Sequence, residues 1–146
     1  LCRNRDTAED LFQDVWGKIV KARASYRPTA KFTTFLYRVA HNCFIDHLRR
    51  NKRHGGATGP DVDLQPHPGE TLEATTERSQ AKQRLATALL ALPDEQRDVF
   101  MLHEEAGLSL DDIAFVTGSN RETAKSRLRY ARKKLLAAID ESPEQQ

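Results

Sequence analysis

The sequence contains few of the features that mark secreted or membrane proteins. Among 146 residues there are two cysteines, Cys2 and Cys43, too few for a disulfide-rich scaffold and typical of a reducing, cytoplasmic compartment. No apolar run approaches the length of a membrane-spanning helix, and no secretory signal pattern opens the chain. The first residue is Leu1 rather than Met, so we expect further sequence ahead of it.

The five histidines do not form a metal-binding pattern with cysteines or carboxylates. His41 and His47 are six residues apart on a predicted helix, too far around it to bind one ion together. No set of residues offers a catalytic nucleophile with its base either. The sequence therefore predicts no metal, no cofactor and no enzymatic activity.

The chain also has little net charge, +2, but the charges are segregated along it. Residues 1–54 hold 12 Lys and Arg against 5 Asp and Glu, and residues 121–146 hold 7 against 4. The residues between them are acidic, with a balance of −4 over 55–78 and again −4 over 79–120. Two basic segments separated by acidic ones indicate a polyanion that is bound at two places.

Glycine and proline concentrate in one stretch, HGGATGPDVDLQPHPGE, residues 54–70. This stretch has neither helical periodicity nor strand-like alternation, and it is typical of a flexible acidic linker. Nearly everything before and after it has helical periodicity. We therefore predict an all-α fold of two small helical domains, residues 1–54 and 79–146, joined by a linker over residues 55–78.

The first predicted helix, within DTAEDLFQDVWGKIV, carries an acidic patch. Asp6 is a candidate N-cap with Glu9 three residues later. Apolar residues at helical spacing predict a buried stripe: Ala8, Leu11, Phe12, Val15 and Ile19. On the other side of the helix lie Asp10, Gln13 and Asp14, which form either an ordinary solvated face or a docking site for a protein partner.

A second helix is predicted by FTTFLYRVAHNCFIDHLRR, residues 32–50, and its outer face is unusual. Its buried face contains Leu36, Val39, Ala40, Cys43 and Phe44. The outer face collects Arg38, Asn42 and Arg49, as a solvated face should. It also collects Phe35 and Ile45, so an exposed aromatic ring there indicates either contact with a ligand or packing against an element outside this chain.

The second half contains LSLDDIAFVTGSNRETAKSRLRYARKKL, which predicts two helices around a tight turn. Ser109 is the expected cap of a helix from Leu110 to Thr117. Gly118 supplies the turn, and Ser119 is the expected cap of the next helix, with Glu122 three residues on.

The second of these helices has one apolar and one basic face. Ala124, Leu128, Ala131 and Leu135 are expected to face inward, and Arg121, Lys125, Arg129 and Arg132 outward. Helix, Gly-containing turn and basic helix are typical of a helix-turn-helix, whose second helix enters the major groove of DNA. Arg and Lys there can donate to guanine O6 and N7. Upstream, Val99, Phe100 and Leu102 are expected to support this unit.

Taken in this order, the motifs resemble regions 2 and 4 of the bacterial sigma-70 family of RNA polymerase sigma factors. They resemble more specifically its small extracytoplasmic-function (ECF) group, in which a linker joins these two regions. AEDLFQDVW is similar to the polymerase-binding helix, FTTFLYRVAHNCFIDHLRR to the melting and −10 recognition helix, and LPDEQRDVFML with the helix-turn-helix to the −35 reading domain. The resemblance covers nearly the whole chain except the linker and the last few residues.

The resemblance implies partners and site residues. The partners are core RNA polymerase, promoter DNA (duplex at −35 and single-stranded at −10) and an anti-sigma factor, with no membrane insertion. The acidic patch Asp10, Gln13 and Asp14 would dock on core polymerase. The implied DNA contacts are Lys31, Phe35, Arg38, Asn42, Arg49, Arg50 and Arg53 in region 2, and Arg121, Thr123, Lys125, Ser126, Arg127, Arg129, Arg132 and Lys133 in region 4.

The resemblance also gives Phe35 a role. Opening a duplex breaks base stacking, and a ring that stacks on an unpaired base replaces about 1–3 kcal/mol of that loss. Phe35 would stack or wedge, where family members often have Trp, and the loop Tyr26–Lys31 would form the wall of a base pocket.

Two other classes of protein remain open. A helix-turn-helix regulator that binds duplex DNA without polymerase would carry a ligand-binding or receiver domain ahead of the motif, whereas residues 1–54 are short, basic and helical. A module that binds only a protein partner would not need two basic faces. We therefore expect a transcription initiation factor, with the chemistry of RNA synthesis left to polymerase.

Overall fold

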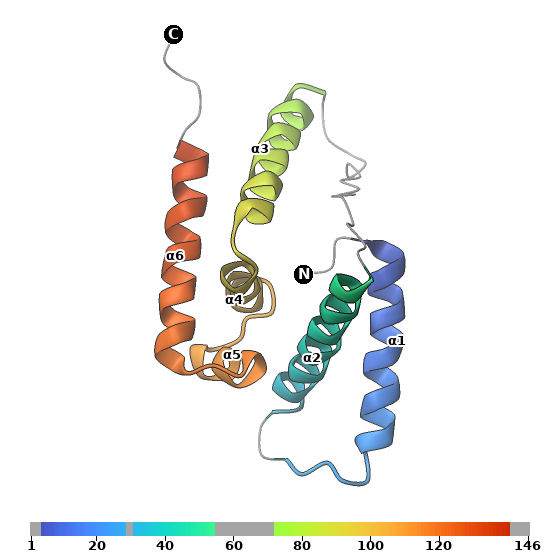
Figure 1. Cartoon of the computed structure of the whole chain (residues 1–146). Coiled ribbons are helices and arrows are strands. Elements are labelled where there is room, and N and C mark those ends of the chain that lie inside the picture. Colours follow the sequence, from blue (N-terminus) through green and yellow to red (C-terminus); the bar gives the residue numbers. More distant parts are fainter. Residues whose placement is uncertain (1–3, 29–30, 55–71, 141–146) are drawn as a thin grey trace.

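The computed structural model describes residues 4–28, 31–54 and 72–140, and all regular structure within these ranges is helical (Figure 1). The helices are α1 (Arg5–Ala22), α2 (Phe32–Arg53), α3 (Leu72–Ala91), α4 (Asp94–Glu104), α5 (Leu110–Thr117) and α6 (Arg121–Asp140). The predicted all-α fold is confirmed. None of the described helices is long and apolar enough to cross a membrane.

In the first half, α1 and α2 lie side by side as a helical hairpin (Figure 1). The cap of α1 is Asn4, whose side-chain oxygen accepts the N–H of Thr7 at 3.2 Å. The cap predicted at Asp6 is therefore wrong by two residues, because Asn caps a helix as well as Asp does. Asp6 lies in the first turn instead, where its negative charge still favours the helix N-terminus.

The second half is built around a core shared by α4, α5 and α6. This cluster contains Val99, Leu102, Leu108, Ile113, Val116, Ala124 and Leu128. A smaller cluster of Leu92, Ala131 and Leu135 joins the end of α3 to α6. The inward positions predicted for Ala124, Leu128, Ala131 and Leu135 are thus confirmed, as is the support expected from Val99 and Leu102.

The turn of the helix-turn-helix has the conformation that its glycine predicts. Ser109 caps α5 by accepting the N–H of Asp112 at 3.1 Å, as expected. Gly118 ends α5 in the left-handed region, with φ 66° and ψ 29°. The next cap is Asn120, which accepts the N–H of Thr123 at 2.8 Å, so the cap predicted at Ser119 is wrong by one residue. The Ser119 hydroxyl instead lies 2.9 Å from that of Thr117.

Helix α3 begins at Leu72, inside the segment 55–78 that the sequence analysis assigns to a linker. Residues 72–78 are therefore helical, because the Gly and Pro residues end before Leu72, and Leu, Glu, Ala and Arg in this segment favour a helix. Residues 55–71 lie outside the described part of the chain. At the other end of α3, the guanidinium of the buried Arg97 donates to the carbonyls of Leu89, Leu90 and Leu92, at 3.3–3.4 Å.

The two halves pack against each other along α2 and α5. Tyr37 of α2 is packed against the core cluster of the second half. The first half has few buried residues of its own, and among the described ones these are Val15, Thr34, His41 and Cys43. Much of the packing of α2 is thus supplied by the second half of the chain.

Candidate nucleic-acid interface

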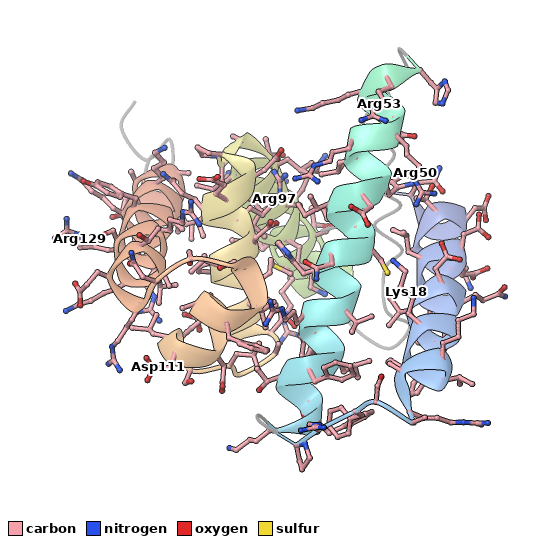
Figure 2. All side chains as sticks on the ribbon, turned by 60° about the horizontal axis from the view of Figure 1, so that its bottom comes forward. Lys18, Arg50, Arg53, Arg97, Asp111 and Arg129 are labelled. Carbon is pink, nitrogen blue, oxygen red and sulfur yellow. The ribbon has the colours of Figure 1, made fainter. Side chains whose placement is uncertain are left out.

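The outer face of α6 presents a row of basic side chains. Lys125, Arg129 and Lys133 are exposed at four-residue spacing, which places them on one face of the helix. Arg129 points away from the rest of the molecule (Figure 2), and its guanidinium carbon lies 5.4 Å from the ring centroid of the neighbouring Tyr130. Because Ala124 and Leu128 anchor the opposite face, this row is displayed on a rigid support.

Three arginines of α6 are instead paired with carboxylates of α4 and α5. The pairs are Arg121 with Asp111 at 3.0 Å, Arg127 with Glu95 at 2.7 Å and Arg132 with Glu104 at 2.5 Å. The hydrogen bond from Arg132 is the main reason that the pKa of Glu104 lies below its ordinary value. These carboxylates partly neutralise the arginines and compete with phosphates for them.

The smaller polar candidates lie at the start of α6. Thr123 is half-buried, and its backbone N–H donates a hydrogen bond to the side-chain oxygen of Asn120. Ser126 is exposed, next to Lys125. The first turns of α6 thus combine short polar and long basic side chains, which is the composition that base edges in a major groove require.

Phe35 of α2 lies in a cluster of aromatic rings. Its ring centroid is 4.9 Å from that of Tyr26 in the preceding loop and 6.5 Å from that of Phe32. Phe35 and Ile45, predicted to lie on the exposed outer face of the helix, are both half-buried. The reason is that the loop and the second half of the chain, neither of which a helical wheel contains, cover this face of α2.

The polar candidates on α2 divide into two groups. Arg38, Asn42 and Arg49 line a cleft of about 370 Å³ between α2 and the second half, and the guanidinium of Arg38 also lies over the ring of Phe115 on α5. Arg50 and Arg53 are exposed near the end of α2 (Figure 2), and Lys31 is exposed just before its start. The charged and polar candidates of α2 are therefore all exposed, and only Phe35 among the candidates is half-buried.

One buried pair was not foreseen from the sequence. Nε2 of His41 on α2 lies 3.4 Å from Oδ2 of Asp98 on α4, and their side chains are only 10% and 8% exposed. A single sequence carries little signal for such a pair, because its members are 57 positions apart (98 against 41). Within the described residues no group of three or more His, Cys, Asp and Glu side chains is placed to hold a metal ion.

The acidic patch Asp10, Gln13 and Asp14 lies on α1 and is exposed. Ala8 and Phe12 of the predicted buried stripe are exposed, Phe12 at 63%, so their predicted burial is wrong; Trp16, on the same helix, is also exposed, at 42%. They line an apolar groove of about 610 Å³ between α1, α2 and α4. Helix α1 thus offers both carboxylates and apolar surface for contacts with another molecule.

Comparison with known proteins connects these features. The family model for sigma-70 region 2 matches residues 1–54, and the model for sigma-70 region 4 matches residues 82–135. The RNA polymerase sigma factor YlaC of Bacillus subtilis is 30% identical over 97% of this chain and 82% of its own length. The chain belongs to the sigma-70 family. Within it, the chain belongs to the ECF group: the ECF RNA polymerase sigma factor SigM of Mycobacterium tuberculosis is 35% identical over 133 residues, 91% of this chain.

The sigma-factor fold extends over both regions. The sigma factor RpoE from Bartonella quintana, solved in complex with the anti-sigma factor NepR, superposes with a TM-score of 0.79 at 26% identity. That superposition covers 97% of this chain and 86% of RpoE. The chain spans 64% of the length of SigM. Region 2 contains α1 and α2, and the region 4 match runs from within α3 to within α6.

Proposed function

We propose that this chain acts as an ECF sigma factor, which directs core RNA polymerase to specific promoters and helps to melt the −10 DNA. The observation that carries the proposal is the presence of both region 2 and region 4 in one chain. In each region, the helix proposed to contact DNA, α2 or α6, has a basic face. It is a factor without chemistry of its own, working in the cytoplasm with polymerase.

The acidic patch on α1 is the proposed docking site for core polymerase. Asp10, Gln13 and Asp14 are exposed, and the apolar rings of Phe12 and Trp16 lie nearby on the same helix. An interface of this kind combines apolar contact with charged groups that guide the encounter. An anti-sigma factor is a further proposed partner, since the similar RpoE was solved with one.

Transcription with purified components tests the proposal. Core polymerase supplemented with this chain should initiate at defined sites on genomic DNA, and sequencing the RNA 5′ ends should return a shared −35 and −10 pattern. Asp10→Lys with Asp14→Lys should abolish binding to core and these transcripts without loss of helicity. Glu77→Lys, an exposed reversal on α3, is the matched control and should leave both unchanged.

The same experiment separates the rival function. A helix-turn-helix regulator that acts without polymerase would bind duplex DNA normally, yet give no new transcript starts and no complex with core. That result would replace the sigma assignment by the regulator assignment.

A further inference from the structure

A second cleft at the junction of α2 and α5 is lined by aromatic rings and arginines. Figure 1 shows α5 beside the first half of α2, and the cleft between them has a volume of about 320 Å³. Its aromatic side chains come from the loop before α2, from α2 and from α5, and they are Tyr26, Phe35 and Phe115. Two arginines, Arg27 and Arg38, also line it. These five side chains form what we call the aromatic pocket.

The rings of the aromatic pocket keep apolar surface that the chain does not cover. The centroids of Tyr26 and Phe35 are 4.9 Å apart, but their planes are inclined at 54°, so the two rings do not stack face to face. Phe115 is 37% exposed, and Phe35 is half-buried. Aromatic faces that remain open can stack a planar base, whatever its sequence identity.

The arginines give the aromatic pocket a positive charge. The guanidinium carbon of Arg38 lies 4.2 Å from the ring centroid of Phe115, and this cation–π contact holds the group at the wall of the pocket. Both arginines are exposed, and within the described residues no ion pair joins either of them to a carboxylate. Of the described residues, no Asp or Glu lines this pocket, whereas Glu95 and Asp98 line the neighbouring cleft. Such guanidinium groups favour phosphate oxygens as partners.

We propose that the aromatic pocket binds a free nucleotide, with its base on the rings and its phosphate on Arg27 and Arg38. Sites for small ligands have volumes of about 300–1,000 Å³, and this pocket lies at the lower end of that range, which suits one nucleotide rather than several. A base that is unpaired from DNA has the same chemistry, so the source of the nucleotide needs a separate argument.

The place of the pocket between the two regions favours the free nucleotide. About 25 base pairs, or about 85 Å of duplex, separate the proposed −10 and −35 elements, whereas α2, the longest of the described helices, is about 33 Å long. A chain bound to both elements therefore cannot keep α5 against α2, and the pocket is complete only in the chain that is not on a promoter. This choice of source rests on the proposed function.

Two substitutions separate the contacts to the base from those to the phosphate. Phe115→Ala removes a stacking face, so it should lower the affinity for a nucleotide and for its nucleoside alike. Arg27→Gln removes a phosphate contact, so it should lower the affinity for the nucleotide and leave that for the nucleoside unchanged. Phe115→Tyr keeps a ring. Tyr130→Ala is the matched control, because Tyr130 is also an exposed ring beside an arginine but lies on α6, outside the pocket.

Titrations of the whole chain, followed by saturation-transfer NMR of the ligand, test the proposal. The probes are AMP, GMP, CMP and UMP, each with its nucleoside as the comparison without phosphate. At least one of the four should bind the parent chain, and Phe115→Ala should weaken that binding at least about fivefold. Phe115→Tyr and Tyr130→Ala should match the parent. Far-UV circular dichroism checks the helicity of each variant, and if Phe115→Ala loses helicity, the comparison of Arg27→Gln with the nucleosides decides.

A single-stranded oligonucleotide of random sequence separates the two sources. With a free nucleotide as the occupant, Phe115→Ala should leave the affinity for the oligonucleotide nearly unchanged. If Phe115→Ala weakens oligonucleotide binding, an unpaired DNA base occupies the pocket and the proposal is overturned. It also fails if no monophosphate binds the parent, or if a helical Phe115→Ala binds as tightly as the parent. None of these results changes the transcript starts that test the proposed function, so the two failures are distinguishable.

Discussion

Replacing Gly118 by Ala should weaken region 4 through backbone conformation alone. Gly118 ends α5 with φ 66°, and a Cβ built there meets nothing within 4 Å, so no clash contributes to the effect. An L-residue in this left-handed conformation costs about 1–2 kcal/mol, and we expect the free energy of unfolding to fall by that amount. Gly118→Asn should cost less, because Asn tolerates this conformation.

Replacing Gly17 by Ala should have the opposite effect on the free energy of unfolding. It lies within α1, where a Cβ also meets nothing within 4 Å. In a helix interior Ala is more favourable than Gly by about 0.5–1 kcal/mol, so Gly17→Ala should stabilise the chain. Gly107 has the φ of Gly118 and equally open space, so Gly107→Ala should behave like Gly118→Ala.

Urea unfolding followed by circular dichroism measures these differences. The midpoint should move down for Gly118→Ala and up for Gly17→Ala, with the denaturant slope unchanged. If Gly118→Ala is as stable as the parent, or less costly than Gly118→Asn, the left-handed turn is not what constrains this position. Destabilisation by Gly17→Ala would equally contradict the reasoning from open space.

Three further predictions concern DNA. Lys125→Ala should reduce the binding free energy by about 1–3 kcal/mol on the preferred −35 site and by less on scrambled duplex, whereas Lys133→Ala should weaken binding to both alike. If binding titrations give the two variants the same ratio of affinities for the preferred and scrambled duplexes, the reading face is misassigned. Glu104→Gln should free Arg132 to contact a DNA phosphate, so the affinity for duplex DNA should rise on all sequences. The slope of log affinity against log salt concentration should steepen by about 0.9. An unchanged slope would show that Glu104 does not compete with phosphate for Arg132. Phe35→Ala should reduce promoter opening several-fold in permanganate footprints, since one stacking contact is worth about 1–3 kcal/mol, and a template pre-melted at −10 should restore much of it. A lower melting temperature for Phe35→Ala without this rescue would leave its ring a purely structural role.

The helices of this protein follow from short-range rules. The bounds of α5, its cap at Ser109 and the turn at Gly118 are those predicted, because the capping hydrogen bond and the left-handed glycine each depend on residues within one turn. The caps at Asn4 and Asn120 were each missed by one or two residues for the same reason: several adjacent side chains can make the same bond.

The candidate site was predictable only in part. The outward row Lys125 and Arg129 follows from helical periodicity, since α6 buries a regular apolar face. The pairing of Arg127 with Glu95 joins positions 32 residues apart, and periodicity within one helix contains no information about it. Which arginines are held by carboxylates, and which are displayed, is therefore a property of the packing of α4, α5 and α6.

The sequence by itself determined the all-helical fold, the helix-turn-helix and the two basic faces, since these depend on contacts within a few residues. The tertiary structure alone decided that α5 lies on α2, that Arg38 faces Phe115 and that His41 is buried against Asp98. Those contacts join two regions across residues 55–71, and a helical pattern shows which face is apolar or charged but not what covers it. For this reason the apolar residues on the outer face of α2, which a helical wheel presents as exposed, lie partly buried within the folded chain.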